Sequence, residues 1–334
     1  MKPLTIWSML HGTLLGTAPK RTTARRTATK MLTPGMRIKR WVWVCIAIIA
    51  VLLITKHELL DTAVGPSSDY VIDLNAMHRA AIAAGPLPES IEVEQIGEFA
   101  FPRTLVVAGQ GFHMHPMVLL SHRVVWPDHS LIIDTAMGPT AAKKMPGAKF
   151  DEGAFERMEA ALKKASAIVF THEHSDHVGG VASAPDFGAI AKQVRMTREQ
   201  LNGPKLERGD FPPGALERIE PLDYQGVYAI APGVVLQKAP GHTPGTQLVY
   251  VELANGNRFL FVGDIAWTKD NIALQTGRPR LATLLMKEDR PAVAAEVRAI
   301  GQLPPDVHVI VAHDPVALQK DLQAGLYRRG FTGL

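Results

Sequence analysis

The sequence predicts a fold of the α+β class, with a β-rich core, helices outside it and a hydrophobic anchor helix ahead of it. Short β-branched or leucine runs bounded by Pro, Gly or Asp recur after about residue 91, as strands do. The stretch 153–165 carries apolar residues at helical spacing, at Phe155, Met158, Ala161 and Leu162. An uncharged run of 15 residues, 41–55, precedes both features.

The composition separates a basic tail from an acidic body. The chain has 334 residues, enough for one large domain or two small ones. Its net charge is +4, yet the first 40 residues hold nine Lys or Arg and no acid, which leaves 27 basic against 32 acidic residues in the remainder. A body with a formal charge of −5 argues against a nucleic-acid partner. Cys45 is the single cysteine, so no internal disulfide forms.

The apolar run 41–55 predicts a membrane anchor. It lies between the length of a signal-peptide core, about 7–15 residues, and that of a membrane span, about 20. Trp41 and Trp43 stand where interfacial aromatics stand, and no small-residue cleavage site follows promptly. The basic flank predicts a cytoplasmic N-terminus, with the body anchored on the extracytoplasmic side. The alternative is a cleaved signal peptide and a periplasmic protein. A buried core helix is disfavoured because the run is apolar on all faces.

The elements follow in order after the anchor. Residues 1–40 are expected to be a disordered basic tail, 56–90 a linker with one short helix at 74–85, and 91–330 the folded domain. The expected strands share a short apolar run that ends at a turn residue or at a His or Asp, and they are 104–109, 117–121, 130–134, 167–174, 234–240, 246–253, 257–264 and 307–314. Asn255-Gly256 is a hairpin signal between the strands at 246–253 and 257–264.

Metal-ligand residue types recur where these strands end. The segment "THEHSDHVGG" supplies His172, His174, Asp176 and His177 at once, and later strands run into His242, Asp264 and His313. Seven nitrogen and carboxylate candidates are too many for one tetrahedral ion but suit two ions about 3.5–4 Å apart that share a carboxylate. Zinc fits this donor set, with iron or manganese as alternatives. Taken singly, Asp264 could instead cap a turn and His313 could pair with Asp314.

The absence of cysteine from this set predicts a site with open positions for water rather than a structural zinc site. Gly179 and Gly180 are expected to let the loop turn tightly beneath the ligands.

The motifs "THEHSDHVGG", "PGHTPGT", "FVGD" and "VAHD", in that order and with Asp134 upstream, resemble the metallo-β-lactamase fold superfamily. The resemblance covers roughly residues 91–320. It implies an αββα four-layer sandwich with a dinuclear site on one edge. By this resemblance His172, His174 and His242 hold one metal. Asp176, His177 and His313 hold the second, and Asp264 bridges. Asp134 orients the loop that carries the ligands.

Within that superfamily, "GDIAWTKDNI" and "AHDP" are most similar to the N-acyl-homoserine lactone lactonases. Two positions depart from their pattern, since Thr246 stands where they carry a second His and Trp267 where they carry a tyrosine. An indole N–H donates a hydrogen bond but cannot shuttle a proton, which puts lactone cleavage in question. The hydroxyacylglutathione-type thioesterases share the first two motifs. Candidates for an apolar substrate pocket or its mouth are Met137, Trp267, Met286, His113 and His115.

The resulting expectation is a dinuclear zinc-dependent hydrolase of an ester, lactone, thioester or amide, with a lactone preferred. A metal-bound hydroxide serves as the nucleophile and Asp176 takes or passes on the proton. The partners expected are a small-molecule substrate and the membrane. One alternative is a non-enzymatic metal-binding or membrane-assembly module. The other is a phosphodiesterase-type relative, which the negative body disfavours.

Overall fold

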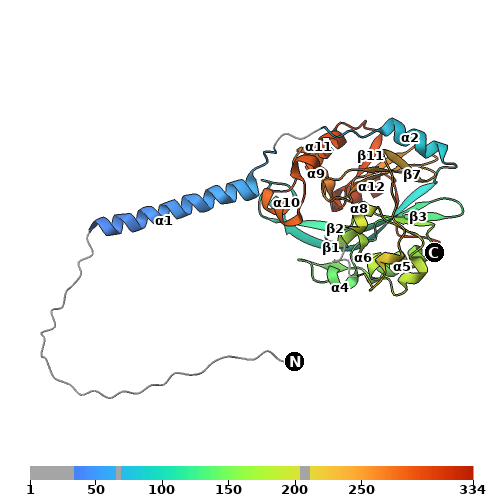
Figure 1. Cartoon of the computed structure of the whole chain (residues 1–334), viewed down its shortest axis with the longest axis horizontal. Helices are drawn as coiled ribbons and strands as arrows, with labels where there is room; N and C mark the ends of the chain where they lie inside the picture. The colour runs from blue at the N-terminus through green and yellow to red at the C-terminus, as the bar shows by residue number, and fades with distance from the viewer. Residues whose placement is uncertain (1–33, 65–68, 204–210, 334) are drawn as a thin grey trace, which may run out of the picture. The chain divides into compact units, whose positions relative to one another are not determined.

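The computed structural model describes residues 34–64, 69–203 and 211–333, and it separates into two compact units that divide after Ala50 (Figure 1). Most of helix α1 (Pro34–Thr55) lies in the first unit. Residues 40–60 form one helical stretch that is long and apolar enough to cross a membrane, and none of it is buried. Most of the predicted basic tail, residues 1–33, lies outside the described residues.

The second unit is built on two β-sheets. One has the order β12-β1-β2-β3-β5-β6 with β4 paired to β1, and the other has the order β11-β10-β9-β8-β7. The strands of the first sheet are β1 (Ser90–Pro102), β2 (Met114–Val125), β3 (Ser130–Ile133), β4 (Lys149–Phe150), β5 (Ala167–Val169), β6 (Val194–Arg195) and β12 (Arg328–Arg329). Those of the second are β7 (Val227–Ala231), β8 (Val234–Lys238), β9 (Gln247–Glu252), β10 (Arg258–Phe261) and β11 (Val307–Ile310).

Alternation along the strands divides the core into three layers, because successive side chains point to opposite faces of a sheet. In β2, Val118 and Leu120 belong to the apolar cluster between the sheets, whereas Met117 and Leu119 face the helices outside the first sheet. In β9, Val249 and Val251 join the same central cluster, whereas Leu248 and Tyr250 face the outer helices of the second sheet. The order helix, sheet, sheet, helix is the predicted αββα sandwich.

Helices cover the outer face of each sheet (Figure 1). The first sheet is covered chiefly by α5 (Glu152–Lys164), α6 (Ser175–Ala182) and α7 (Phe187–Ile190). The second is covered by α2 (Leu74–Ala83), α11 (Arg290–Gly301) and α12 (Pro315–Gln323). The remaining short helical elements are η1 (Lys56–Leu60), α3 (Arg103–Val106), α4 (Pro139–Ala142), α8 (Arg198–Leu201), η3 (Leu216–Arg218), η4 (Gly263–Ile265), α9 (Lys269–Ala273) and α10 (Arg280–Met286).

Two predictions of local structure were wrong or incomplete. The run 104–109, predicted to be a strand, forms the single helical turn α3 and a following loop. Tertiary contacts favour this turn over a strand: Thr104 Oγ1 donates to Leu59 O (2.8 Å), and Asn271 Nδ2 donates to Val106 O (2.9 Å). The 13-residue strand β1, which pairs with β2 along its length except for a bulge at Ile96, was not predicted. The hairpin at Asn255-Gly256 is present between the antiparallel strands β9 and β10, with Gly256 at φ +87°.

The directions of the strands place the candidate ligands at one edge of the sandwich. Strands β3 and β5 are parallel, so Asp134 and the segment from His172 leave the first sheet at the same end. Strands β10 and β11 are parallel, and β8 runs in their direction because β9 is antiparallel to both β8 and β10. His242, Asp264 and His313 therefore follow the same end of the second sheet.

Candidate metal centre

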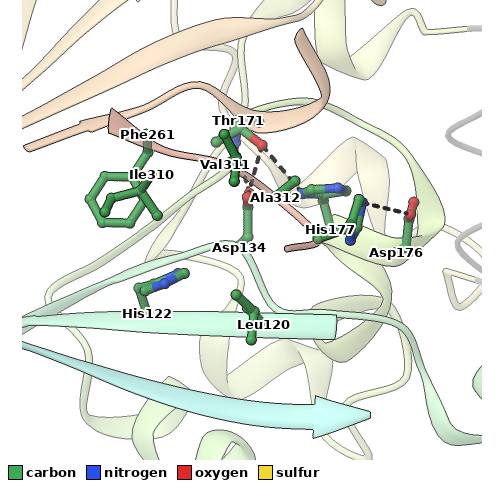
Figure 2. A pocket seen from close by; sticks show the side chains of 12 residues that line it. Leu120, His122, Asp134, Thr171, Asp176, His177, Phe261, Ile310, Val311 and Ala312 are labelled. Atoms are coloured by element: carbon green, nitrogen blue, oxygen red, sulfur yellow. Dashed lines mark hydrogen bonds and ion pairs between the residues drawn. The ribbon is translucent and has the colours of Figure 1, made fainter. Parts of the chain in front are cut away.

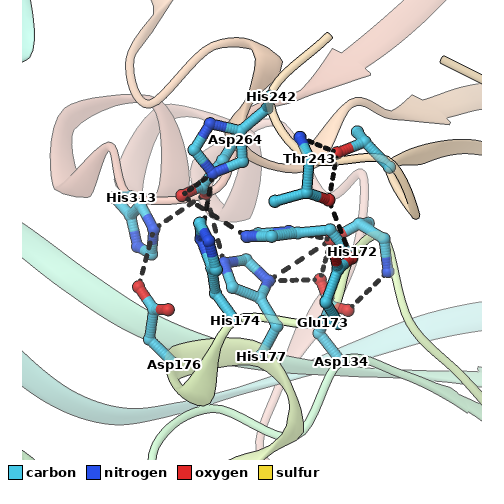
Figure 3. Close-up of polar contacts among 12 residues, drawn as sticks. Asp134, His172, Glu173, His174, Asp176, His177, His242, Thr243, Asp264 and His313 are labelled. Atoms are coloured by element: carbon cyan, nitrogen blue, oxygen red, sulfur yellow. Dashed lines mark hydrogen bonds and ion pairs between the residues drawn. The ribbon is translucent and has the colours of Figure 1, made fainter. Parts of the chain in front are cut away.

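The seven candidate ligands lie together in two groups that share Asp264 (Figure 3). One group joins His172, His174, His242 and Asp264, and the other joins Asp176, His177, Asp264 and His313. Within each group, one potential ligand atom per residue lies within 4.8 Å of all the others. Two four-membered sets with one common carboxylate have the composition expected for two ions.

Neighbouring acceptors determine which ring nitrogen of three histidines faces the centre. The carbonyl of Val118 accepts from Nδ1 of His313 (2.8 Å). Carboxylates lie against Nδ1 of the other two, Asp134 at 2.9 Å from His177 and Glu288 at 2.8 Å from His242. An imidazole that donates through Nδ1 keeps its lone pair on Nε2, which is the form that binds a metal. In all three residues Nε2 then points at Asp264, at 3.1–3.4 Å.

The buried polar atoms of the centre fit a pair of cations. Nε2 of His172 and Nε2 of His313 are buried, and neither has a hydrogen-bond partner among the described residues. The ring centroids of His172 and His177 lie 4.0 Å apart, and those of His172 and His242 lie 4.8 Å apart. Protonated imidazoles at this spacing would repel one another, whereas neutral imidazoles that share cations would not. The donor set, its burial and its spare nitrogens therefore fit metal ions.

The charge balance of the centre depends on Asp264. Burial alone would raise the pKa of its carboxyl, but the imidazoles of His313, His172 and His177 hold that pKa well below its usual range. Burial lowers the pKa of His172 well below its ordinary value, which keeps this ring neutral. The pKa of His177 is raised well above its ordinary value despite burial, because Asp134 and Asp264 flank the ring.

Asp134 ties the first sheet to the ligand-bearing segment. Its two oxygens accept from the backbone N–H of Thr171 (2.8 Å) and from Thr171 Oγ1 (2.8 Å), in addition to the contact with His177. Asp134 and Ala136 have φ of +56° and +53°, in the left-handed region that non-glycine residues adopt at a cost. The strained turn after β3 therefore aims the Asp134 carboxylate at Thr171 and His177.

A small cavity lies beside this carboxylate (Figure 2). It measures about 20 Å³ and is lined by His122, Asp134 and His177 among others. That volume suffices for one water molecule. Burial lowers the pKa of His122 to about 4, so the ring is neutral at physiological pH. Its edge meets the Phe261 ring with centroids 4.9 Å apart, as expected of a core residue.

An ion pair behind His242 was not predicted from the sequence. Arg278 and Glu288, at 0% and 1% side-chain exposure, form a salt bridge, and Arg278 Nε donates to Glu288 Oε2 (2.8 Å). The Arg278 guanidinium also lies over the Trp267 ring, 4.9 Å from its centroid. "GRPR" and "KED" have the composition of a surface loop, so the sequence carries no signal of this burial.

Glu173 lies between two ligand candidates in the sequence, and its side chain holds two loops together. Its Oε2 accepts from Thr243 Oγ1 (2.7 Å), and Thr246 Oγ1 accepts from the backbone N–H of Thr243 (2.9 Å). Glu173 thus joins the segment from His172 to the loop that carries His242. Thr246, which departs from the lactonase pattern, belongs to the same network.

Gly179 and Gly180 lie inside α6 rather than in a tight turn, so their expected role was wrong. A Cβ at Gly179 would lie 2.4 Å from Gly138 N, and one at Gly180 would lie 2.4 Å from Thr135 O. These glycines let α6 approach the turn after β3 closely enough to donate backbone hydrogen bonds to Ala136 O and Thr135 O.

The candidates for the substrate pocket are spread more widely. Trp267 is buried beside the centre, with its ring 6.0 Å from that of His313, and its Nε1 has no hydrogen-bond partner among the described residues. Met137 is a core residue, and Met286 packs against the same apolar cluster.

His113 is exposed, and His115 meets Arg103, whose Nη1 lies 3.0 Å from its Nε2. His115 lines a separate 220 Å³ cavity with Arg103, Lys269 and Asp270, and the seven ligand candidates contribute nothing to its lining.

Comparison with known proteins places this architecture in a family. The sequence model of the metallo-beta-lactamase superfamily matches residues 124–313, which include all seven candidate ligands and Asp134. The chain belongs to the metallo-β-lactamase superfamily. The family match begins inside β2 and ends at His313, so the superfamily region contains both sheets' contributions to the centre.

Among curated superfamily relatives, the chain is 31% identical to an N-acyl homoserine lactonase of Bacillus sp over 104 residues, 31% of this chain and 40% of that protein. It is 32% identical to a "Probable metallo-hydrolase" of Mycobacterium bovis over 178 residues, 44% of this chain and 54% of that protein. The matched region thus spans about half or less of the length of these relatives.

Solved structures share the metallo-β-lactamase fold. A quorum-quenching N-acyl homoserine lactone lactonase aligns with a TM-score of 0.53 at 19% identity, covering 70% of this chain and 95% of that one. AidC, a dizinc quorum-quenching lactonase, aligns with a TM-score of 0.50 at 16% identity, covering 67% and 86%. At these identities the likeness concerns the fold.

Proposed function

We propose that this chain is a metal-dependent hydrolase of a carboxylic acid derivative, with a lactone as the preferred substrate class. The observation that carries the proposal is the commitment of Nδ1 in His177, His242 and His313 to carboxylate or carbonyl acceptors, which leaves three Nε2 lone pairs around Asp264. Such orientation is typical of metal-binding histidines. The lactonases among the superfamily relatives support the choice of substrate class.

Two ions, proposed as zinc with iron or manganese as alternatives, would be held by the two groups that share Asp264. His172, His174 and His242 would hold one, Asp176, His177 and His313 the other. Such ions lower the pKa of water and polarise a carbonyl, which supplies a nucleophile and stabilises negative charge. The chain contributes imidazoles that are oriented through Nδ1, and it excludes bulk water from the buried side of the centre.

Asp176 is placed to hold a proton during the reaction. Its side chain is 20% exposed, whereas those of Asp264 and His313 are 2% exposed, so it faces the open side of the centre. Its Oδ2 lies 3.6 Å from His313 Nε2. A carboxylate at the boundary between buried ligands and solvent can accept a proton from the attacking water and return it to the leaving group.

Trp267 is proposed to donate a hydrogen bond to a substrate oxygen. A buried indole N–H usually has a partner, and here Nε1 has none among the described residues. The ring is fixed beside His313 by the Arg278 guanidinium and by Phe101, whose ring centroid lies 6.1 Å away. Because indole cannot shuttle a proton, Trp267 would orient the substrate while Asp176 handles protons.

One experiment separates the substrate classes. The purified full chain, loaded with zinc, is assayed side by side on N-acyl homoserine lactones, thioesters, β-lactams and a phosphodiester, with the metal content of each preparation measured. We expect metal-dependent turnover that is highest on lactones and is lost, with bound metal, in His172→Ala. Higher turnover on the phosphodiester would favour a phosphodiesterase-type enzyme, and no turnover on any substrate with full metal loading would favour a non-enzymatic module.

We further propose that residues 41–55 anchor the chain in a membrane with the domain of residues 91–330 on the extracytoplasmic side. The side chains along the helix are exposed, for example Trp41 at 72% and Ile54 at 62%. The nine basic residues that precede it favour a cytoplasmic N-terminus. Flotation of the full chain with membranes tests the anchor, and protease protection of sealed cells tests its direction. A shortened mature chain would instead show a cleaved signal peptide and a periplasmic domain.

A further inference from the structure

Helix α10 presents an apolar face to solvent. Leu281, Leu284 and Leu285 are 37%, 72% and 71% exposed, and their spacing of i, i+3 and i+4 places them on one face of the helix. The opposite face is already used, since Thr283 is buried and Met286 packs against the core outside the first sheet. Two neighbouring leucines that are more than two-thirds exposed on a packed helix indicate a surface that binds a partner.

The end of the candidate membrane span is tied to this helix. Element η1 belongs to the same compact unit as α10 and contacts it directly. A cavity of 370 Å³ lies beside this contact and is lined by His57 and Glu58 of η1 and by Thr283 and Leu284 of α10.

Further hydrogen bonds hold the segment after η1 to the body. Arg290 donates to Asp61 O (2.8 Å) and to Ala63 O (2.7 Å). Thr104 Oγ1 donates to Leu59 O within η1 itself. The residues that follow the span are therefore fixed to the body at several points, so the body cannot swing far from the place where the chain leaves the membrane.

We propose that the leucine face of α10, defined by Leu281, Leu284 and Leu285, docks on the lipid bilayer at the level of the headgroups. The proposal rests on the membrane anchor proposed above. The span of 21 residues, 40–60, is about 31 Å long at the ~1.5 Å rise of a helix, close to the ~30 Å of a bilayer's hydrocarbon core. The last turn of the span, residues 56–60, then reaches the interface, and the helix bound to it lies there too.

Apolar contact rather than charge carries this docking. The ionised side chains on α10, on η1 and next to these elements nearly balance: Lys56, Arg280, Lys287 and Arg290 are basic, and Glu58, Asp61 and Asp289 are acidic. Amphipathic helices at an interface bury their apolar face about 5–10 Å into the headgroup and acyl boundary. A near-neutral rim predicts docking on a zwitterionic bilayer without anionic lipid.

The position of α10 in the chain connects the proposed docking surface to the metal centre. Arg278 stands two residues before the helix and Glu288 two residues after it, and both contact His242. Helix α10 therefore connects the two residues that contact Nδ1 of His242.

The test uses the full chain with Cys45→Ala, so that one introduced cysteine can carry an environment-sensitive fluorophore. The label is placed at Leu285→Cys, and at Lys163→Cys, an exposed position on α5, as the control. In phosphatidylcholine vesicles we expect a blue shift at position 285 and a drop of about twofold in its emission with brominated acyl chains, as for an interfacial helix. Position 163 should show neither change.

Three results would overturn the proposal, each in a different way. Quenching absent from position 285 in a chain that floats with the vesicles leaves the anchor intact and refutes the docking. A chain that does not float removes the anchor and the docking together. Disulfide cross-linking of Leu285→Cys between chains diluted in lipid, without quenching, would assign the leucine face to a second copy of the chain. Lactone turnover in solution is measured separately, so none of these results depends on the proposed reaction.

Discussion

Replacing Arg278 with methionine should destabilise the fold by about 3–5 kcal/mol, because it leaves the Glu288 carboxylate buried without its cation. Loss of the stacking on Trp267 adds up to about 2 kcal/mol for a desolvated cation–π contact. An opposing gain of about 1–3 kcal/mol comes from Arg278 Nη1, a buried donor without a hydrogen-bond partner among the described residues. These two contributions nearly cancel, so the unpaired carboxylate dominates.

The assay is thermal unfolding of the detergent-solubilised full chain in excess chelator, so that metal binding does not contribute. For a domain of this size each kcal/mol lowers Tm by about 2–4 °C, which gives an expected drop of about 6–20 °C for Arg278→Met. The double variant Arg278→Met with Glu288→Gln should recover most of this loss, because the neutral amide still offers an oxygen to His242 and no charge remains buried.

A matched control lies on the surface of the same body. Arg198 and Asp223 form an ion pair at 2.6 Å with side chains 58% and 56% exposed, so Arg198→Met should leave the Tm nearly unchanged. The reasoning is refuted if Arg278→Met melts within the range of Arg198→Met, or if the double variant is no more stable than the single one.

Three further predictions concern the centre and its surroundings. Asp134→Asn should weaken metal binding about 10–100-fold in a chelator competition, because the amide has one acceptor oxygen and no charge, and so cannot accept from Thr171 and His177 as the two carboxylate oxygens do; unchanged affinity would contradict the role given to Asp134. Trp267→Phe should lower kcat/KM on the preferred substrate about 10-fold by removing one donor, and Trp267→Tyr should restore part of it. In the folded chain the pKa of His122 is about 4, whereas its ordinary value is 6.5. Between these two pH values the imidazole is protonated in the unfolded chain but neutral in the folded one. Stability should therefore fall by about 3 kcal/mol from pH 7 to pH 4, and His122→Leu should fall less over that range.

The fold and the ligand candidates were accessible from sequence because their signals are local. A strand that ends in a His or Asp can be recognised from six or seven consecutive residues, and this pattern located His172, His242, Asp264 and His313. The structure then showed that strand direction brings those ends to one edge. The hairpin at 255–256 was equally local, since the Asn-Gly pair marks the turn by itself.

Other features depend on contacts between distant segments. The run 104–109 reads as a strand because it is rich in β-branched residues, but contacts with Leu59 and Asn271 fix it as a turn of helix. Strand β1 was missed because Glu92 and Glu94 interrupt its apolar pattern. Both are buried and paired, Glu92 with Arg123 at 2.7 Å and Glu94 with Arg157 at 2.7 Å, which a single sequence does not reveal.

The role of Gly179 and Gly180 shows the same limit in a different form. Glycine in a loop-like motif suggests freedom to turn, whereas the requirement here is empty space for the backbone of the turn after β3. Likewise, the local sequence around Arg278 and Glu288 does not distinguish an exposed ion pair from a buried one. Burial is a property of the assembled sheets and helices.

Because the ligand candidates are divided between the two sheets, metal binding would stabilise the contact between the sheets. His172, His174, Asp176 and His177 extend from the first sheet, whereas His242, Asp264 and His313 extend from the second, and each proposed ion takes ligands from both. An ion at 1,000 times its dissociation constant would contribute about 4 kcal/mol to holding the sheets together. A chelator would then loosen the sandwich as well as empty it, and the metal-free chain should be the more protease-sensitive form.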